Sequence, residues 1–184
     1  MSKPIHVVGF AGSLRKASWN AGLLREAQAL APEGMTIEII DLLEVPLYNG
    51  DVEAAGLPAS VLHLRERFKA ADAAIIVTPE YNGSISAVTK NAYDWLTRVE
   101  NLIPGKPTLL MGVSAGGTGA SRAHNHLSQI AKGGQARLVE PFVQIPFGGQ
   151  KFDSAGVLTD ESVRPEILRG LQDLLKLARE EPAK

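Results

Sequence analysis

The chain has 184 residues, of which 45% are hydrophobic and 21% charged, and its formal net charge is −1. These values predict one domain with a sizeable core over residues 1–184, and they give no sign of a nucleic-acid or membrane partner. The absence of cysteine excludes disulfides, thiolate nucleophiles and sulfur-ligated metals, and the lack of a long apolar run or secretory signal pattern predicts a cytoplasmic protein.

Short apolar strands alternate with helical patterns along the whole chain. Strands are predicted at 5–10, 36–41, 73–77, 108–114 and 136–139, with the last resuming at 142–145 as an open alternative. Helices are predicted at 20–30, 59–71, 87–97, 121–131 and 160–179, and a long functional or interface loop at 45–51. This alternation predicts an α/β fold, namely a flavodoxin-like doubly wound parallel five-stranded sheet with strand order 2-1-3-4-5.

A polar loop at 12–20 follows the first predicted strand and leads into a helix. The free N–H groups and positive dipole end of that helix favour an anion, and a guanidinium suits phosphate. The candidate phosphate-binding residues are Ser13, Arg15, Ser18, Trp19 and Asn20. A capped helix with a solvated Arg15 would explain only one of these polar residues. Because no Walker A or dinucleotide fingerprint is present, the loop predicts a site for a terminal monophosphate.

Two further loops follow buried strands and are predicted to lie at the same crevice. In the stretch 78–84, Pro79 stiffens the turn, so that backbone groups can face the polar edge of a flat ring. The candidate ring-binding residues there are Pro79, Glu80, Tyr81, Asn82 and Gly83. The glycine-rich turn at 114–119 adds Ser114, Gly116 and Gly117, whose N–H groups would stabilise negative charge on a reduced flavin. Ordinary turns are the alternative for both stretches, but together with the phosphate site they predict FMN.

These loops also carry a family resemblance that extends over nearly the whole chain. Gly-Ser-Leu-Arg-Lys-Ala-Ser-Trp-Asn at 12–20, Pro-Leu-Tyr-Asn at 46–49 and Thr-Pro-Glu-Tyr-Asn at 78–82, followed by Lys-Asn-Ala-Tyr-Asp-Trp-Leu at 90–96, resemble the NADPH-dependent FMN reductase family. The similarity is to its quinone, chromate and azo-dye reductase branch. It implies FMN as cofactor, NADPH or NADH as hydride donor, a small-molecule electron acceptor, and a homodimer or homotetramer. One departure is Ser86, where many members have proline; Ser86 can cap the next helix instead.

We therefore expect an FMN-dependent NAD(P)H reductase that passes electrons to quinone-like acceptors by a ping-pong mechanism. Chromate, azo dyes and free flavin are further expected acceptors. A flavodoxin-type electron carrier without its own substrate is the alternative, and a flavin-free scaffold is a third option. No side chain stands out as catalytic. No metal site is expected either, because His124 and His126 lie two residues apart on a predicted helix and do not share a face.

Overall fold

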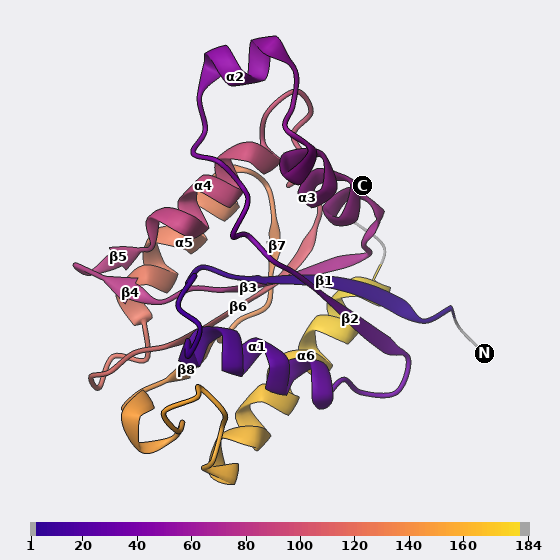
Figure 1. Ribbon diagram of the computed structural model, residues 1–184. Helices are drawn as coiled ribbons and strands as arrows, with labels where there is room; N and C mark the ends of the chain where they lie inside the picture. Colours follow the sequence, from indigo (N-terminus) through magenta and orange to yellow (C-terminus); the bar gives the residue numbers. More distant parts are fainter. Residues whose placement is uncertain (1–2, 181–184) are drawn as a thin grey trace.

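The computed structural model describes residues 3–180, which form a parallel sheet covered by helices (Figure 1). The strands run in the order β2-β1-β3-β6-β7, and β8 pairs with β6 beyond the end of β7. Their bounds are β1 Ile5–Ala11, β2 Met35–Ile40, β3 Ala73–Val77, β6 Pro107–Val113, β7 Arg137–Leu138 and β8 Val143–Ile145. Since β7 and β8 form one interrupted edge strand, the predicted order 2-1-3-4-5 is confirmed.

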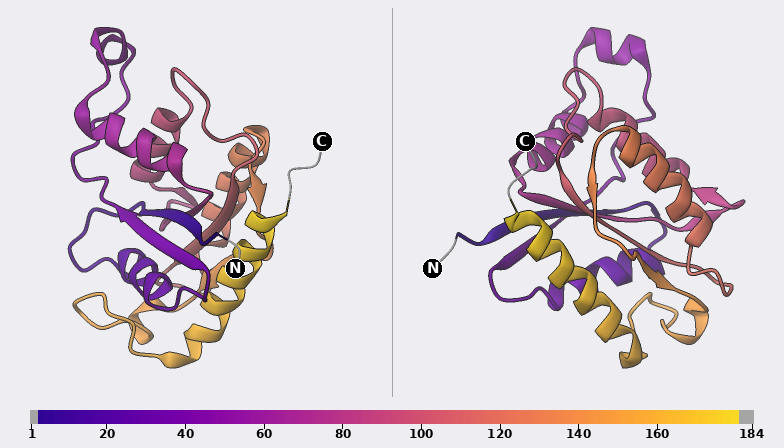
Figure 2. Two further views of the ribbon diagram at one scale, coloured as in Figure 1. Left: turned by 90° about the vertical axis from the view of Figure 1, so that its right-hand side faces the viewer. Right: turned by 180° about the vertical axis from the view of Figure 1, so that it is seen from behind.

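Helices cover both faces of this sheet, as the two further views in Figure 2 show. On one face lie α1 (Trp19–Ala29) and α6 (Arg164–Arg179); on the other lie α3 (Ala59–Ala70), α4 (Ala87–Leu96) and α5 (Ser121–Gly133). Successive strand side chains point to opposite faces, so Val7 packs with α1 and α6 while Val8 packs with α3 and α4. The central strands are therefore apolar on both sides, as a doubly covered parallel sheet requires.

The structure adds short elements that the hydrophobic pattern did not predict. The helix α2 (Gly50–Ala55) overlaps the end of the predicted loop at 45–51 and extends past it. It begins where the Asn49 side chain accepts a hydrogen bond from the Asp51 N–H. The second polar stretch contains a hairpin, β4 (Glu80–Tyr81) and β5 (Ser84–Ile85). Its turn residues Asn82 and Gly83 have φ values of 52° and 72°, the positive values that an Asn-Gly hairpin turn uses.

Caps explain where several helices begin. The Ser18 hydroxyl accepts from the Ala21 N–H at the start of α1, and the Ser86 hydroxyl accepts from the Thr89 N–H at the start of α4, as expected for Ser86. The last helix starts later than predicted, because a 3-10 turn, η2 (Glu161–Val163), precedes α6. A second 3-10 turn, η1, spans Gly148–Gln150. None of the helices described is long and apolar enough to cross a membrane.

Candidate functional site

Three loops leave the carboxyl ends of adjacent strands at one edge of the sheet, on the left of Figure 1. We call the stretch 12–20 after β1 the first loop, 78–83 after β3 the second loop, and 114–119 after β6 the third loop. They start side by side, because the Gly12 N–H donates to the Val77 carbonyl at 2.8 Å and the Thr78 N–H donates to the Met111 carbonyl at 2.9 Å. This edge is where open α/β sheets bind ligands.

Buried hydroxyl groups tie the first loop to the second. The Ser86 hydroxyl donates to the Gly12 carbonyl at 2.6 Å and lies 2.9 Å from the Thr89 hydroxyl, which donates to the Thr78 hydroxyl at 3.0 Å. Ser86, Thr89 and Thr78 are all buried. A Cβ at position 12 would lie 1.8 Å from the Thr89 oxygen and 2.7 Å from the Ser86 oxygen, so this contact admits only glycine.

The first loop presents positive charge and free donors at the start of α1. Arg15 and Lys16 are exposed and form no ion pair within residues 3–180. The backbone N–H groups of Trp19 and Asn20, in the first turn of α1, have no partner among the residues described. Free N–H groups at a positive helix end, together with an unpaired guanidinium, fit a phosphate monoester such as that of FMN.

Two of the residues expected in the phosphate site use their side chains elsewhere. The Asn20 amide donates to the Val113 carbonyl at 3.2 Å, and its oxygen accepts from the Val113 N–H at 3.0 Å. Asn20 therefore joins the first loop to the end of β6, and only its backbone N–H is free. The Trp19 indole packs against Gly148, where a Cβ would lie 2.5 Å from the ring. The Ser18 hydroxyl caps α1, while Ser13 and Arg15 remain available.

The second loop combines a buried start with an exposed tip. Pro79 is buried, whereas Tyr81 keeps 49% of its surface exposed. The Glu80 carboxylate accepts a hydrogen bond from the Arg122 N–H at 3.0 Å, in the first turn of α5, and so complements the positive end of that helix. The side chain of Glu80 thus fixes the second loop to α5. The groups left to face a ring are the backbone of the hairpin, its tip at Asn82 and Gly83, and the Tyr81 side chain.

The third loop offers fewer donors than expected. The Ser114 N–H is already paired with the Ile145 carbonyl at 3.1 Å, which extends the β8 pairing, so it is not free for a flavin. The N–H groups of Gly116 and Gly117 have no partner among the residues described, and both glycines are exposed. A Cβ on Gly117 would lie 3.2 Å from the Phe147 ring. The two glycines therefore remain as the donors that fit the polar edge of an isoalloxazine ring.

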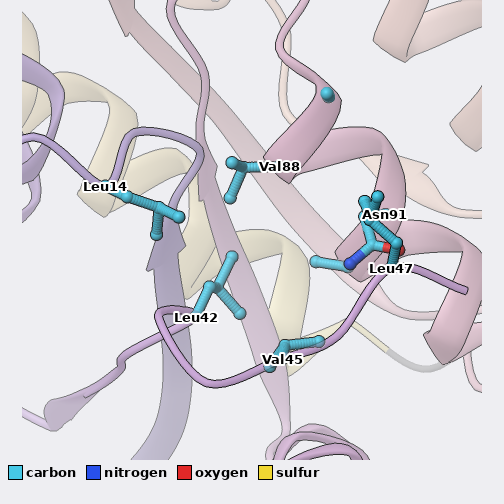
Figure 3. A pocket seen from close by; sticks show the side chains of 8 residues that line it. Leu14, Leu42, Val45, Leu47, Val88 and Asn91 are labelled. Carbon is cyan, nitrogen blue, oxygen red and sulfur yellow. The ribbon is translucent and has the colours of Figure 1, made fainter.

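An apolar cavity of about 200 Å³ adjoins the first loop on the side of α4. In Figure 3, Leu14 from the first loop, Leu42 and Val45 from the segment after β2, and Val88 from α4 surround a common space. Asn91 is the polar residue of this wall; its amide donates to the Pro46 carbonyl at 2.9 Å, and its oxygen accepts from the Tyr48 N–H. A cavity of this composition suits a flat, largely apolar molecule.

Behind the second and third loops lies His124, which is fully buried on α5. Its Nδ1 is 3.3 Å from the Gln144 amide nitrogen, and its Nε2 has no hydrogen-bond partner among the residues described. A Cβ on Gly112 would lie 2.9 Å from that Nε2, so the ring packs directly against β6. Burial lowers the pKa of His124 below its usual value of 6.5. The folded protein therefore holds this imidazole neutral.

This lowered pKa predicts a pH-dependent stability. Above pH 6.5 the His124 side chain is neutral in both folded and unfolded states; below it, the unfolded chain takes up a proton that the folded chain resists. We expect the free energy of unfolding to fall between pH 7 and pH 5, by at most about 1.4 kcal/mol per pH unit from this group. Urea unfolding should show a shallower fall for His124→Gln. The other histidines are present in both the unchanged protein and His124→Gln. If the free energy of unfolding fell equally with pH in the two proteins, this role of His124 would be contradicted.

Known proteins resemble this chain over most of its length. The model of the family described as NADPH-dependent FMN reductase matches residues 5–150. An NAD(P)H-dependent FMN reductase of Pseudomonas aeruginosa is 44% identical over 176 residues, which cover 95% of both proteins. A quinone reductase of Escherichia coli is 41% identical over 133 residues, or 71% of each protein.

A solved structure gives the same result. The flavoenzyme FerB of Paracoccus denitrificans, an NAD(P)H:(acceptor) oxidoreductase, superposes with a TM-score of 0.84 at 31% identity, over 95% of this chain and 97% of that one. Residues 5–150, which the family model matches, include the sheet and the three loops at its edge. The chain belongs to the NADPH-dependent FMN reductase family and is an oxidoreductase that uses FMN and NAD(P)H.

Proposed function

We propose that this protein is a reductase that transfers electrons from NAD(P)H to quinone-like acceptors, working as one flavodoxin-like FMN-binding domain over residues 1–184. The observation that carries the proposal is the meeting of three loops at one sheet edge. Free N–H groups at Trp19 and Asn20 lie at one loop, and free N–H groups at Gly116 and Gly117 lie at another. The names of the relatives, an FMN reductase, a quinone reductase and an acceptor oxidoreductase, support the same reaction class.

Each loop has a separate task in this proposal. The Arg15 guanidinium and the first turn of α1 bind the phosphate, while the second loop supports the ring through its backbone and the Tyr81 side chain. The N–H groups of Gly116 and Gly117 donate to the pyrimidine edge, where negative charge develops on reduction. FMN, when bound, supplies the redox chemistry by accepting a hydride and passing electrons on. The protein holds, orients and electrostatically tunes it.

The choice of acceptor follows from the surroundings of the first loop. The apolar side chains of Leu14, Leu42 and Val88 beside the first loop support a quinone ring as the preferred acceptor in the crevice that the three loops define. The positive charge of exposed Lys16, which forms no ion pair within residues 3–180, supports weaker use of an oxyanion such as chromate. Azo dyes and free flavin share the flat aromatic character of a quinone and are further acceptors in this proposal.

We expect NAD(P)H and the acceptor to use one crevice in turn, because the three loops define a single ligand edge. Initial rates measured over a grid of NADPH and quinone concentrations should then give parallel double-reciprocal lines, as a ping-pong reaction requires. Intersecting lines would indicate a ternary complex and contradict the shared crevice. Near-zero NADPH oxidation with every acceptor would instead support an electron carrier. Repeating the grid with NADH, chromate and an azo dye ranks the donors and acceptors.

We further propose that the chain assembles as a homodimer or homotetramer with the flavin near the subunit border. Two aromatic side chains beside the loops support this arrangement, since Tyr81 and Phe147 keep 49% and 48% of their surfaces exposed. Half-exposed aromatic side chains are frequent at subunit contacts, where they bury a large area at low entropic cost.

A further inference from the structure

A second and larger cavity, of about 490 Å³, lies between α1 and the carboxyl end of β2. We call it the α1–β2 groove. Residues 13–16 of the first loop line one end of it, and its other lining residues are Ala11 of β1, residues of α1 and the segment 39–43. No residue of the second or third loop lines it, so it is space that the proposed flavin ring does not use. Its volume lies in the range of small-molecule sites.

One wall of the α1–β2 groove is apolar. Leu24 from α1, Ile39 from β2 and Leu43 line it. Leu43 and Ile39 keep 59% and 37% of their surfaces exposed, although Ile39 lies on a strand of the sheet. Exposed aliphatic side chains along one wall of a groove favour a flat aromatic group, which would cover them from water.

The polar groups of the groove have a defined order. Arg15 and Lys16 line the groove from the first loop and form no ion pair within residues 3–180. Arg25 lines it from α1, and its guanidinium donates to the Gly156 carbonyl at 3.2 Å. Asp41 follows the last residue of β2; one of its oxygens accepts from the Leu43 N–H at 2.9 Å, and the other has no partner among the residues described. Positive charges thus lie beside the phosphate-binding loop, and a carboxylate lies at the end of β2.

This order matches the parts of an adenosine phosphate. Lys16 and Arg25 would bind its phosphate, since Arg15 is assigned to the FMN phosphate. The Asp41 carboxylate would accept ribose hydroxyl groups, as an acidic residue does in dinucleotide-binding α/β folds, and the apolar wall would cover the adenine. We propose that the α1–β2 groove is an adenylate subsite, which takes the adenosine phosphate portion of a dinucleotide. The inference rests on the proposed function, because it supplies a place for the non-reacting half of a dinucleotide such as NADPH.

The test uses adenine nucleotides as probes on FMN-loaded protein, so that no turnover is needed. Calorimetric titration with AMP, 5′-ADP and 2′,5′-ADP should show saturable binding of at least one nucleotide to the unchanged protein. Leu43→Glu, which places negative charge on the apolar wall, should weaken that binding at least tenfold. Leu62→Glu is the matched control, since Leu62 is also an exposed leucine but lies on α3. No nucleotide binding, or equal binding to Leu43→Glu and the unchanged protein, would overturn the proposal.

Two further arms identify the source of the adenylate. Tighter binding of 2′,5′-ADP than of 5′-ADP points to NADPH, whose ribose carries the 2′-phosphate. If flavin-free protein binds FAD more tightly than FMN, and Leu43→Glu removes that difference, the adenylate belongs to FAD. FMN affinity is measured by fluorescence on the same samples and should be unchanged in Leu43→Glu. Protein that fails to bind FMN refutes the proposed function, whereas protein that binds FMN but no adenine nucleotide refutes only the groove.

Discussion

Replacing Gly12 by alanine should lower the free energy of unfolding by about 3 kcal/mol and weaken FMN binding at least tenfold. The new methyl group would lie 1.8 Å from the Thr89 hydroxyl oxygen, in a place that is buried on all sides. Overpacking costs about 1–3 kcal/mol, and breaking a buried hydrogen bond such as that of Ser86 to the Gly12 carbonyl costs a similar amount. The binding loss follows because this contact sets the first loop against the second.

Gly133→Ala is the control for this variant. Gly133 is the last residue of α5, a Cβ there would meet no atom within 4 Å, and its φ is not in the positive range. Alanine at this helical position should leave stability unchanged or raise it by up to about 1 kcal/mol. Urea unfolding and FMN fluorescence titration measure both variants. A Gly12→Ala protein as stable as Gly133→Ala, with unchanged FMN affinity, would show that the hydroxyl contacts do not hold the loops.

Replacing Arg15 by alanine should weaken FMN binding by about tenfold to a hundredfold, because hydrogen bonds to a charged group contribute about 1.5–3 kcal/mol. Riboflavin lacks the phosphate, so its affinity should change little. The effect should also shrink at high salt, since Arg15 is exposed and its attraction to phosphate is screened. Fluorescence titrations with FMN and riboflavin at low and high ionic strength measure both expectations.

Arg169→Ala provides the comparison for a lost surface arginine. Arg169 lies on α6, where it pairs with Asp173 at 3.0 Å and donates to the Pro141 carbonyl. Its removal should leave both flavin affinities unchanged. An equal loss of FMN and riboflavin affinity in Arg15→Ala would place Arg15 at the ring or in folding instead of at the phosphate.

Much of the fold could be predicted from the sequence because the central strands are apolar on both faces. The strands predicted at 5–10, 73–77 and 108–114 correspond to β1, β3 and β6, with differences of one residue at some ends. Elements set by local turn chemistry were missed. The β4–β5 hairpin depends on Asn82 and Gly83, a recognisable Asn-Gly signal, but its two-residue strands are too short for a hydrophobic pattern to show.

The meeting of the polar loops at one sheet edge could be predicted from the sequence, but which of their donors stay unpaired could not. The polar residues of 12–20 and 78–83 indicated a ligand edge, yet a sequence does not say which donors the protein itself uses. Asn20 joins the first loop to Val113, and Glu80 caps α5. The buried hydroxyls of Thr78, Ser86 and Thr89 were not predicted as a group, because their contacts cross between loops that only the fold brings together.

The most direct test of the central claim is a crystal structure of the FMN complex. We expect the phosphate to contact the Arg15 guanidinium and the free N–H groups of Trp19 and Asn20, with the ring between the second loop and the N–H groups of Gly116 and Gly117. A ring bound in the α1–β2 groove, or a phosphate away from the start of α1, would contradict the assignment of the three loops as the flavin site.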